Sequence, residues 1–194
     1  MSPAGRAAKR IIDVAASALA LGVGWPALAV ISILIRRENS GPAIFRQERA
    51  GRDMKPFTMY KFRTMRCDAD PFGASPESAQ DARLTPLGRR LRESSLDELP
   101  QLWNVLKGDM SLVGPRPLYM SQAREFTERE RRRLDVRPGL TGLAQVQVRG
   151  ELPHKDKLEI DVRYVERQSL CLDFRILWRS FAGLFGRREV YQKW

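Results

Sequence analysis

Two adjacent carboxylates, Asp97 and Glu98, are the side chains of this sequence best suited to chemistry. Pro100 follows them and fits the first turn of a helix, where unpaired N–H groups and the helix dipole favour negative charge. Asp97 is therefore predicted to be ionised and able to act as a nucleophile. Neighbouring helix residues project about 100° apart, so we expect one carboxylate to attack while the other, Glu98, binds a metal ion. The alternative is structural: Asp97 caps the helix, and Glu98 completes a capping box with Ser95.

Arginines on stiff turns follow the carboxylate pair. Arg116 lies within Gly114-Pro115-Arg116-Pro117, and Arg137 opens the run Arg137-Pro138-Gly139-Leu140-Thr141-Gly142. Such turns suit phosphate clamps, because a guanidinium group binds phosphate oxygens in pairs. For Arg116 the alternative is a solvated surface arginine.

Composition narrows the choice of chemistry. A chain of 194 residues with 43% hydrophobic residues suffices for one domain with a core. The net charge of +11 suits nucleic acid, anionic lipid or phosphorylated substrates equally. His154 is the only histidine, which argues against a Ser-His-Asp triad or a multi-histidine zinc site. Cys67 and Cys171 fit no metal spacing and indicate a reducing compartment.

An apolar segment near the N-terminus predicts a membrane anchor. Val14 to Ile35 carries no charge over 22 residues, long enough to cross a hydrocarbon core about 30 Å thick. Pro26 lies near its middle and predicts a bend and a break of the helix at mid-depth. Arg6, Lys9, Arg10, Arg36 and Arg37 make both flanks basic, so both ends are predicted to stay cytoplasmic, as in a re-entrant hairpin. A cleaved signal peptide and a straight single span are the alternatives.

The other elements predict a mostly α fold with one small β-hairpin. Residues 1–40 form the expected anchor and 41–194 a cytosolic catalytic region. Leu170 to Phe185 is expected to be an interfacial amphipathic helix, with an ordinary core helix as the alternative. The other expected elements are a hairpin of Ala43–Gln47 and Phe57–Phe62 around Gly51, a loop over 67–82, and helices at Leu87–Arg92, from Asp97 to Gly108, Leu118–Leu134 and Asp156–Arg167.

Four motifs in order resemble the bacterial sugar transferases known as monotopic phosphoglycosyl transferases. The similarity extends from about Lys9 to Phe185. The motifs are Tyr60-Lys61-Phe62-Arg63-Thr64-Met65, the segment from Ser95 to Ser111, Val113-Gly114-Pro115-Arg116-Pro117, and the segment from Val136 to Gln145.

The resemblance implies that a UDP-sugar and undecaprenyl phosphate react to give undecaprenyl-diphospho-sugar and UMP. The phosphosugar would pass through a covalent adduct on the residue matching Asp97, with Mg²⁺ associated with Glu98, at the cytoplasmic face of a bacterial inner membrane. Lys61, Arg92, Arg116 and Arg149 match basic positions around that active site. The family breaks its re-entrant helix at Ser-Pro, whereas this chain has Trp25-Pro26. Gln147-Val148 replaces a more usual Asn-Gly before Arg149.

Two other functions compete with this interpretation. A soluble glycosyltransferase would bind metal and nucleotide through Asp68-Ala69-Asp70, but alternating strands and helices are absent. A membrane-tethered nucleic-acid-binding module would use the run Arg129 to Arg133, although no nucleic-acid-binding motif accompanies it, so we expect no nucleic-acid partner. The sequence identifies neither the sugar nor the oligomeric state.

Overall fold

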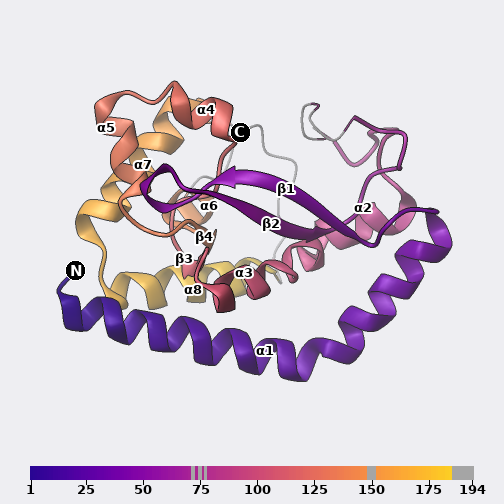
Figure 1. Cartoon of the computed structure of the whole chain (residues 1–194), viewed down its shortest axis with the longest axis horizontal. Coiled ribbons are helices and arrows are strands. Elements are labelled where there is room, and N and C mark those ends of the chain that lie inside the picture. Colours follow the sequence, from indigo (N-terminus) through magenta and orange to yellow (C-terminus); the bar gives the residue numbers. More distant parts are fainter. Residues whose placement is uncertain (71–72, 74–75, 77, 148–151, 185–194) are drawn as a thin grey trace.

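The computed structural model describes residues 1–70, 73, 76, 78–147 and 152–184. Arg149 lies outside these residues, as do Val148 and Phe185. In Figure 1 a long N-terminal helix runs along the lower edge, and the rest of the chain lies above it. The fold is mostly helical with a two-stranded antiparallel sheet, as predicted, and a second two-stranded sheet that is parallel.

The N-terminal helix α1 (Pro3–Glu38) is continuous past Pro26. It bends in Figure 1, but the predicted break into two helices does not occur. Its most apolar stretch is long enough to cross a membrane and is only 6% buried within the protein, so α1 is not a core helix. This exposure fits membrane association, because so much apolar surface is unfavourable in water. The re-entrant path remains a prediction.

The predicted hairpin is confirmed. Strand β1 (Ile44–Ala50) pairs antiparallel with β2 (Pro56–Phe62) in a register that runs from Ile44 opposite Phe62 to Ala50 opposite Pro56. The connection contains the 3-10 turn η1 (Arg52–Met54).

The next elements lead into the carboxylate pair. Helix α2 (Pro86–Glu93) begins as predicted, because the Thr85 side chain accepts from the Gly88 N–H at 2.9 Å. Ser95 then takes the left-handed conformation with φ 58°, which is rare for a non-glycine residue. Asp97 and Glu98 follow in the separate 3-10 turn η2 (Leu96–Glu98), and helix α3 (Gln101–Lys107) starts only after Pro100. The placement of Asp97 at the start of the α-helix was therefore wrong.

The parallel strands were not predicted. Strand β3 (Ser111–Val113) pairs with β4 (Gly139–Thr141), and the short helix α6 (Leu143–Gln147) follows. Two glycines permit this approach. A Cβ at Gly114 would lie 2.5 Å from the Arg137 carbonyl oxygen, and one at Gly139 would collide with the Gly114 backbone.

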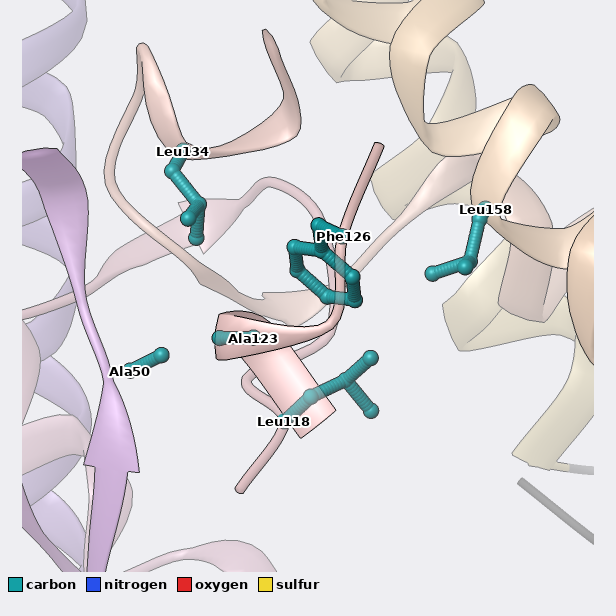
Figure 2. Packing of buried hydrophobic residues seen from close by; sticks show 6 residues of the cluster. All are labelled: Ala50, Leu118, Ala123, Phe126, Leu134 and Leu158. Carbon is teal, nitrogen blue, oxygen red and sulfur yellow. The ribbon is translucent and has the colours of Figure 1, made fainter. Parts of the chain in front are cut away.

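The predicted single helix from Leu118 to Leu134 is wrong. The segment forms α4 (Met120–Arg124), α5 (Glu128–Arg131) and the 3-10 turn η3 (Arg132–Leu134). Thr127 starts a new helix, since its side chain accepts from the Glu130 N–H and the Glu130 carboxylate accepts from the Thr127 N–H. Phe126, between the helices, points into a cluster with five other buried side chains (Figure 2): Ala50, Leu118, Ala123, Leu134 and Leu158.

Two helices complete the fold. Helix α7 (His154–Arg167) agrees with its prediction, and α8 (Leu170–Leu184) lies against α1 through an ion pair of Lys9 with Asp173 at 2.7 Å. Helix α8 has two apolar faces. Ile176 is buried, whereas Phe174, Trp178 and Phe181 are 57%, 72% and 57% exposed. The exposed aromatic side chains fit an interfacial helix better than an ordinary core helix.

Candidate active site

Asp97 and Glu98 lie where three distant segments meet. Asp97 is buried, with 7% of its surface exposed, and the Glu98 side chain is 21% exposed. The Glu98 Oε1 atom accepts from Lys61 Nζ at 3.3 Å and from Arg116 Nη2 at 3.2 Å. The structure thus brings together four of the residues that the sequence singled out, from β2, η2 and the turn after β3.

The capping-box alternative for this pair does not hold. The Ser95 side chain makes no capping hydrogen bond to η2, and Glu98 is engaged with the two cations instead. The backbone of Glu98 donates to the Ser95 carbonyl at 3.3 Å. Both carboxylates are therefore available for a role other than capping.

The backbone of Arg116 is held in place by the buried ion pair of Arg133 and Asp161. Its backbone carbonyl accepts from Arg133 Nη2 at 2.6 Å, and the same Nη2 donates to Asp161 at 2.7 Å. The Arg133 and Asp161 side chains are each only 1% exposed. Sequence reasoning missed this support, because a charged residue in an arginine-rich run reads as a solvated surface position.

Asn104 fastens α3 to the strand that carries Lys61. It is fully buried, accepts from the Tyr60 N–H at 3.1 Å and donates to the Thr58 carbonyl at 2.7 Å. The amide thereby imitates a neighbouring strand along the edge of β2. This residue was also missed, although it lies within the motif between Ser95 and Ser111.

Two arginines support the C-terminal end of α3. Arg10 of α1 donates to the carbonyls of Val105 and Leu106 at 2.6 and 2.9 Å, where helix carbonyls lack partners and the dipole favours a cation. Arg137 donates to the Gly108 carbonyl at 2.7 Å. Arg137 is therefore engaged in anchoring the helix end, which argues against the phosphate clamp that its turn suggested.

The charges of the two carboxylates are set differently. Burial and, next, the charge of the neighbouring Glu98 raise the pKa of Asp97, the charges of Lys61, Arg92 and Arg116 oppose the rise, and the resulting pKa is about 6. Burial also acts against ionisation of Glu98, but the charges and hydrogen bonds of Lys61 and Arg116 outweigh it and lower its pKa to about 2. Asp97 thus combines a raised basicity with a largely ionised state at neutral pH.

The other predicted basic residues have different places. Arg92 donates to the Thr64 hydroxyl at 2.9 Å, and its charge acts on Asp97. Burial lowers the pKa of Lys61, although Glu98 opposes this. Arg149 lies outside the described residues. Arg49 of β1 was not singled out from the sequence, yet its charge acts on both Lys61 and Arg116.

The residues present fit a magnesium ion. Among the described residues no group of three or more His, Cys, Asp and Glu side chains forms a ready-made metal site. Mg²⁺ needs none, because it is usually held by one or two carboxylates, substrate phosphates and water. Lys61 and Arg116 both donate to the Oε1 atom of Glu98. Glu98, which the two cations keep ionised, is the residue suited to hold the ion.

The family model described as bacterial sugar transferase matches residues 4–187. This chain belongs to the bacterial sugar transferase family. The transferase is 44% identical over 170 residues to the uncharacterized sugar transferase EpsL of Bacillus subtilis, covering 87% of this chain and 83% of that protein. It is 41% identical over 196 residues to the UDP-glucose:undecaprenyl-phosphate glucose-1-phosphate transferase of Caulobacter vibrioides, covering 94% of this chain and 72% of that one.

A third relative of the transferase acts on a different sugar. It is the UDP-N-acetylgalactosamine-undecaprenyl-phosphate N-acetylgalactosaminephosphotransferase of Aeromonas hydrophila, 37% identical over 194 residues, covering 93% of this chain and 45% of that protein. The names of the Caulobacter and Aeromonas proteins differ in the donor sugar and agree in the undecaprenyl phosphate acceptor.

The arginine-rich run that suggested nucleic-acid binding is engaged within the protein. Arg129 and Arg132 pair with carboxylates of α7, at 2.7 Å to Glu159 and 2.7 Å to Glu166 respectively. Arg133 is buried against Asp161. The described residues of this run thus do not form an open basic patch for phosphate backbones.

Proposed function

We propose that this transferase moves a sugar 1-phosphate from a UDP-sugar to undecaprenyl phosphate and releases UMP. The observation that carries the proposal is the buried Asp97 beside a Glu98 that Lys61 and Arg116 keep ionised. The named relatives support the two substrates, since two of them have a UDP-sugar and undecaprenyl phosphate in their names. The product would serve as the first lipid-linked sugar of a bacterial glycan such as a capsule, O-antigen, exopolysaccharide or glycoprotein glycan.

In the first step Asp97 attacks the phosphorus that carries the sugar. A bond forms between a carboxylate oxygen and this phosphorus, the bond from phosphorus to the bridging oxygen breaks, and UMP leaves with the electron pair on that oxygen. Ionised Asp97 needs no general base for this attack. Its raised pKa makes it a better nucleophile than an ordinary aspartate while it stays largely ionised at neutral pH.

The cations and Glu98 balance the charge that moves. Lys61 and Arg116 are placed to neutralise phosphate oxygens, and Arg92 acts on the same region. From the family resemblance we expect Arg149 to join them. A bound Mg²⁺ on Glu98 would neutralise charge on the diphosphate and polarise its phosphorus–oxygen bonds. The two paired cations hold Glu98 ionised, so it keeps the negative charge that a metal ligand requires.

In the second step the acceptor takes the phosphosugar. An oxygen of undecaprenyl phosphate attacks the phosphorus on Asp97, the aspartyl–phosphorus bond breaks, and the free carboxylate returns. The acceptor is a membrane lipid, so the site must lie near a membrane. The exposed apolar faces of α1 and α8 are suited to lie in that membrane.

We place the protein at the cytoplasmic face of the bacterial inner membrane, where nucleotide sugars occur. The basic residues on both flanks of the apolar stretch, Arg6 and Lys9 before it and Arg36 and Arg37 after it, favour a cytoplasmic position for both ends. In this arrangement α1 enters and leaves the same leaflet with its bend toward the membrane interior. Residues 1–40 then anchor the catalytic region formed by residues 41–194.

The test of the reaction is product analysis with purified full-length protein, undecaprenyl phosphate and a panel of UDP-sugars. A phosphoglycosyl transferase releases UMP, whereas an ordinary glycosyltransferase releases UDP. Asp97→Asn should lose both turnover and the covalent phosphosugar, because the amide keeps the shape and lacks the anionic nucleophile. UDP as the nucleotide product, or turnover above about 1% in Asp97→Asn with none in Glu98→Gln, would refute the assignment, since a hundredfold loss corresponds to only about 2.7 kcal/mol.

A further inference from the structure

Arg49 lies on the same face of the hairpin as Lys61. Side chains alternate along a strand, and residues directly opposite each other across two strands share a face. The register pairs Arg49 with Phe57 and Lys61 with Phe45. Phe45, Gln47 and Arg49 of β1 therefore face the same way as Phe57, Met59 and Lys61 of β2. This face is turned to the protein, since Gln47 and Met59 are both buried.

The guanidinium group of Arg49 is fixed in its orientation. It stacks on the ring of Tyr119, 3.6 Å from the ring centroid, and its Nη2 donates to the Gln47 side chain. Gln47 in turn donates to the Tyr119 hydroxyl at 3.1 Å. A stacked and braced arginine loses little conformational freedom when it binds an anion. The Nε atom of Arg49 is buried and has no hydrogen-bond partner among the described residues.

The site carries more positive than negative charge. The charges of Lys61, Arg92 and Arg116 act on Asp97, and that of Arg49 acts on Lys61 and Arg116. Four cations thus gather around two carboxylates, Asp97 and Glu98. Buried like charges repel one another and are costly without a counter-ion. The diphosphate of a nucleotide sugar, which carries one negative charge on the oxygens of each phosphate group, would supply the missing anion.

The position of Arg49 selects one of the two phosphates. Arg116 bonds directly to Glu98, whereas among the described residues Arg49 forms no ion pair with either carboxylate and reaches the site through its neighbours. The phosphorus that Asp97 attacks must lie against Asp97. The other phosphate, which leaves with the nucleoside, is the one that extends away from the carboxylate pair.

We propose that Arg49 binds the phosphate of the departing UMP. This inference rests on the proposed function, because it assigns a residue to one phosphate of the proposed donor. Tyr119 and Gln47 are positioning residues that hold the Arg49 guanidinium in place. By stabilising negative charge on the leaving phosphate, Arg49 would bind the donor and assist cleavage of the diphosphate.

Binding of UMP and of uridine to the full-length protein in detergent micelles, followed by calorimetry with Mg²⁺ present, tests this assignment. Arg49→Gln should weaken UMP binding about 10- to 100-fold, as expected for loss of hydrogen bonds to a charged group, and leave uridine binding unchanged. Arg46→Gln is the matched control: Arg46 is exposed on the opposite face of the same strand, with its guanidinium 6.0 Å from the Tyr60 ring centroid. The Arg46→Gln variant should bind UMP as tightly as the wild type.

Arg49→Lys keeps the test decisive if Arg49→Gln fails to fold. It retains the charge but loses the planar fork and the stacking on Tyr119, so its affinity for UMP should fall between those of the wild type and Arg49→Gln. The inference is overturned if a folded Arg49 variant binds UMP as tightly as Arg46→Gln does. Failure of the wild type to bind UMP at all would instead overturn the proposed donor and, with it, the inference.

Discussion

The charge coupling between Asp97 and Glu98 predicts how the first half-reaction depends on pH. Because burial and Glu98 raise the pKa of Asp97 to about 6, formation of the covalent phosphosugar should fall as the pH drops through about 6. At pH 5 about a tenth of the nucleophile is then ionised, against about nine tenths at pH 7. The assay is a single-turnover measurement of UMP release from the donor alone, since a phosphate monoester such as the acceptor itself titrates near pH 6.

Two substitutions should move this acid limb in opposite directions. Glu98→Gln removes a negative charge that raises the Asp97 pKa, whereas Lys61→Met removes a cation that lowers it. Charges a few ångström apart near a protein surface interact by about 2 to 4 kcal/mol, and one pH unit corresponds to about 1.4 kcal/mol. We therefore expect shifts of at least about one pH unit, downward for Glu98→Gln and upward for Lys61→Met, on top of slower turnover in both.

The control for these shifts is Glu93→Gln, which removes an exposed carboxylate from the last turn of α2. Its acid limb should coincide with that of the wild type. The reasoning is refuted if the wild type shows no limb near pH 6, or if Glu98→Gln moves it to higher pH.

Three further outcomes follow from the structure. Chelation with EDTA should stop turnover and added Mg²⁺ should restore it, and full activity in EDTA would remove the metal from the mechanism. Arg133→Met should destabilise the fold by about 3 to 5 kcal/mol, because it leaves the buried Asp161 carboxylate without its cation. The double variant with Asp161→Leu should recover most of this stability, as measured by thermal unfolding. Single cysteines at positions 6 and 37, in an otherwise cysteine-free protein, should both resist a membrane-impermeant thiol reagent added to intact spheroplasts, whereas labelling at position 6 alone would indicate a full crossing.

Elements built from local signals could be predicted from the sequence. The alternating residues around Gly51 form the hairpin, Thr85 and Pro86 start α2, and Gly108 ends α3 in the left-handed conformation with φ 93°. Each of these signals acts within a few residues of the chain. The motif around Asp97 and Glu98 likewise identified the carboxylates and the family, because the identity and spacing of those residues are properties of the sequence itself.

Contacts between distant segments could be decided only by the tertiary structure. The run from Leu118 to Leu134 has the composition of one helix, yet Phe126 turns into the core with Ala50 and Leu158, and the helix is interrupted there. Burying an aromatic side chain contributes more than continuing an exposed charged helix, so packing outweighs local propensity.

The electrostatics of the site depend on the same long-range packing. The sequence predicted that a helix N-terminus would keep Asp97 ionised. The residue instead lies in a 3-10 turn, where burial and the neighbouring charges set its pKa. Arg49 shows the same limit: nothing in its local sequence separates it from Arg46, three residues earlier. Only the folded hairpin directs Arg49 toward Lys61 and Arg116, because side chains alternate along a strand and Arg49 shares a face of the hairpin with Lys61. The sequence by itself thus determined the family and the candidate reactive groups, and the tertiary structure determined the charge and the neighbours of these groups, because both depend on atoms brought together from distant parts of the chain.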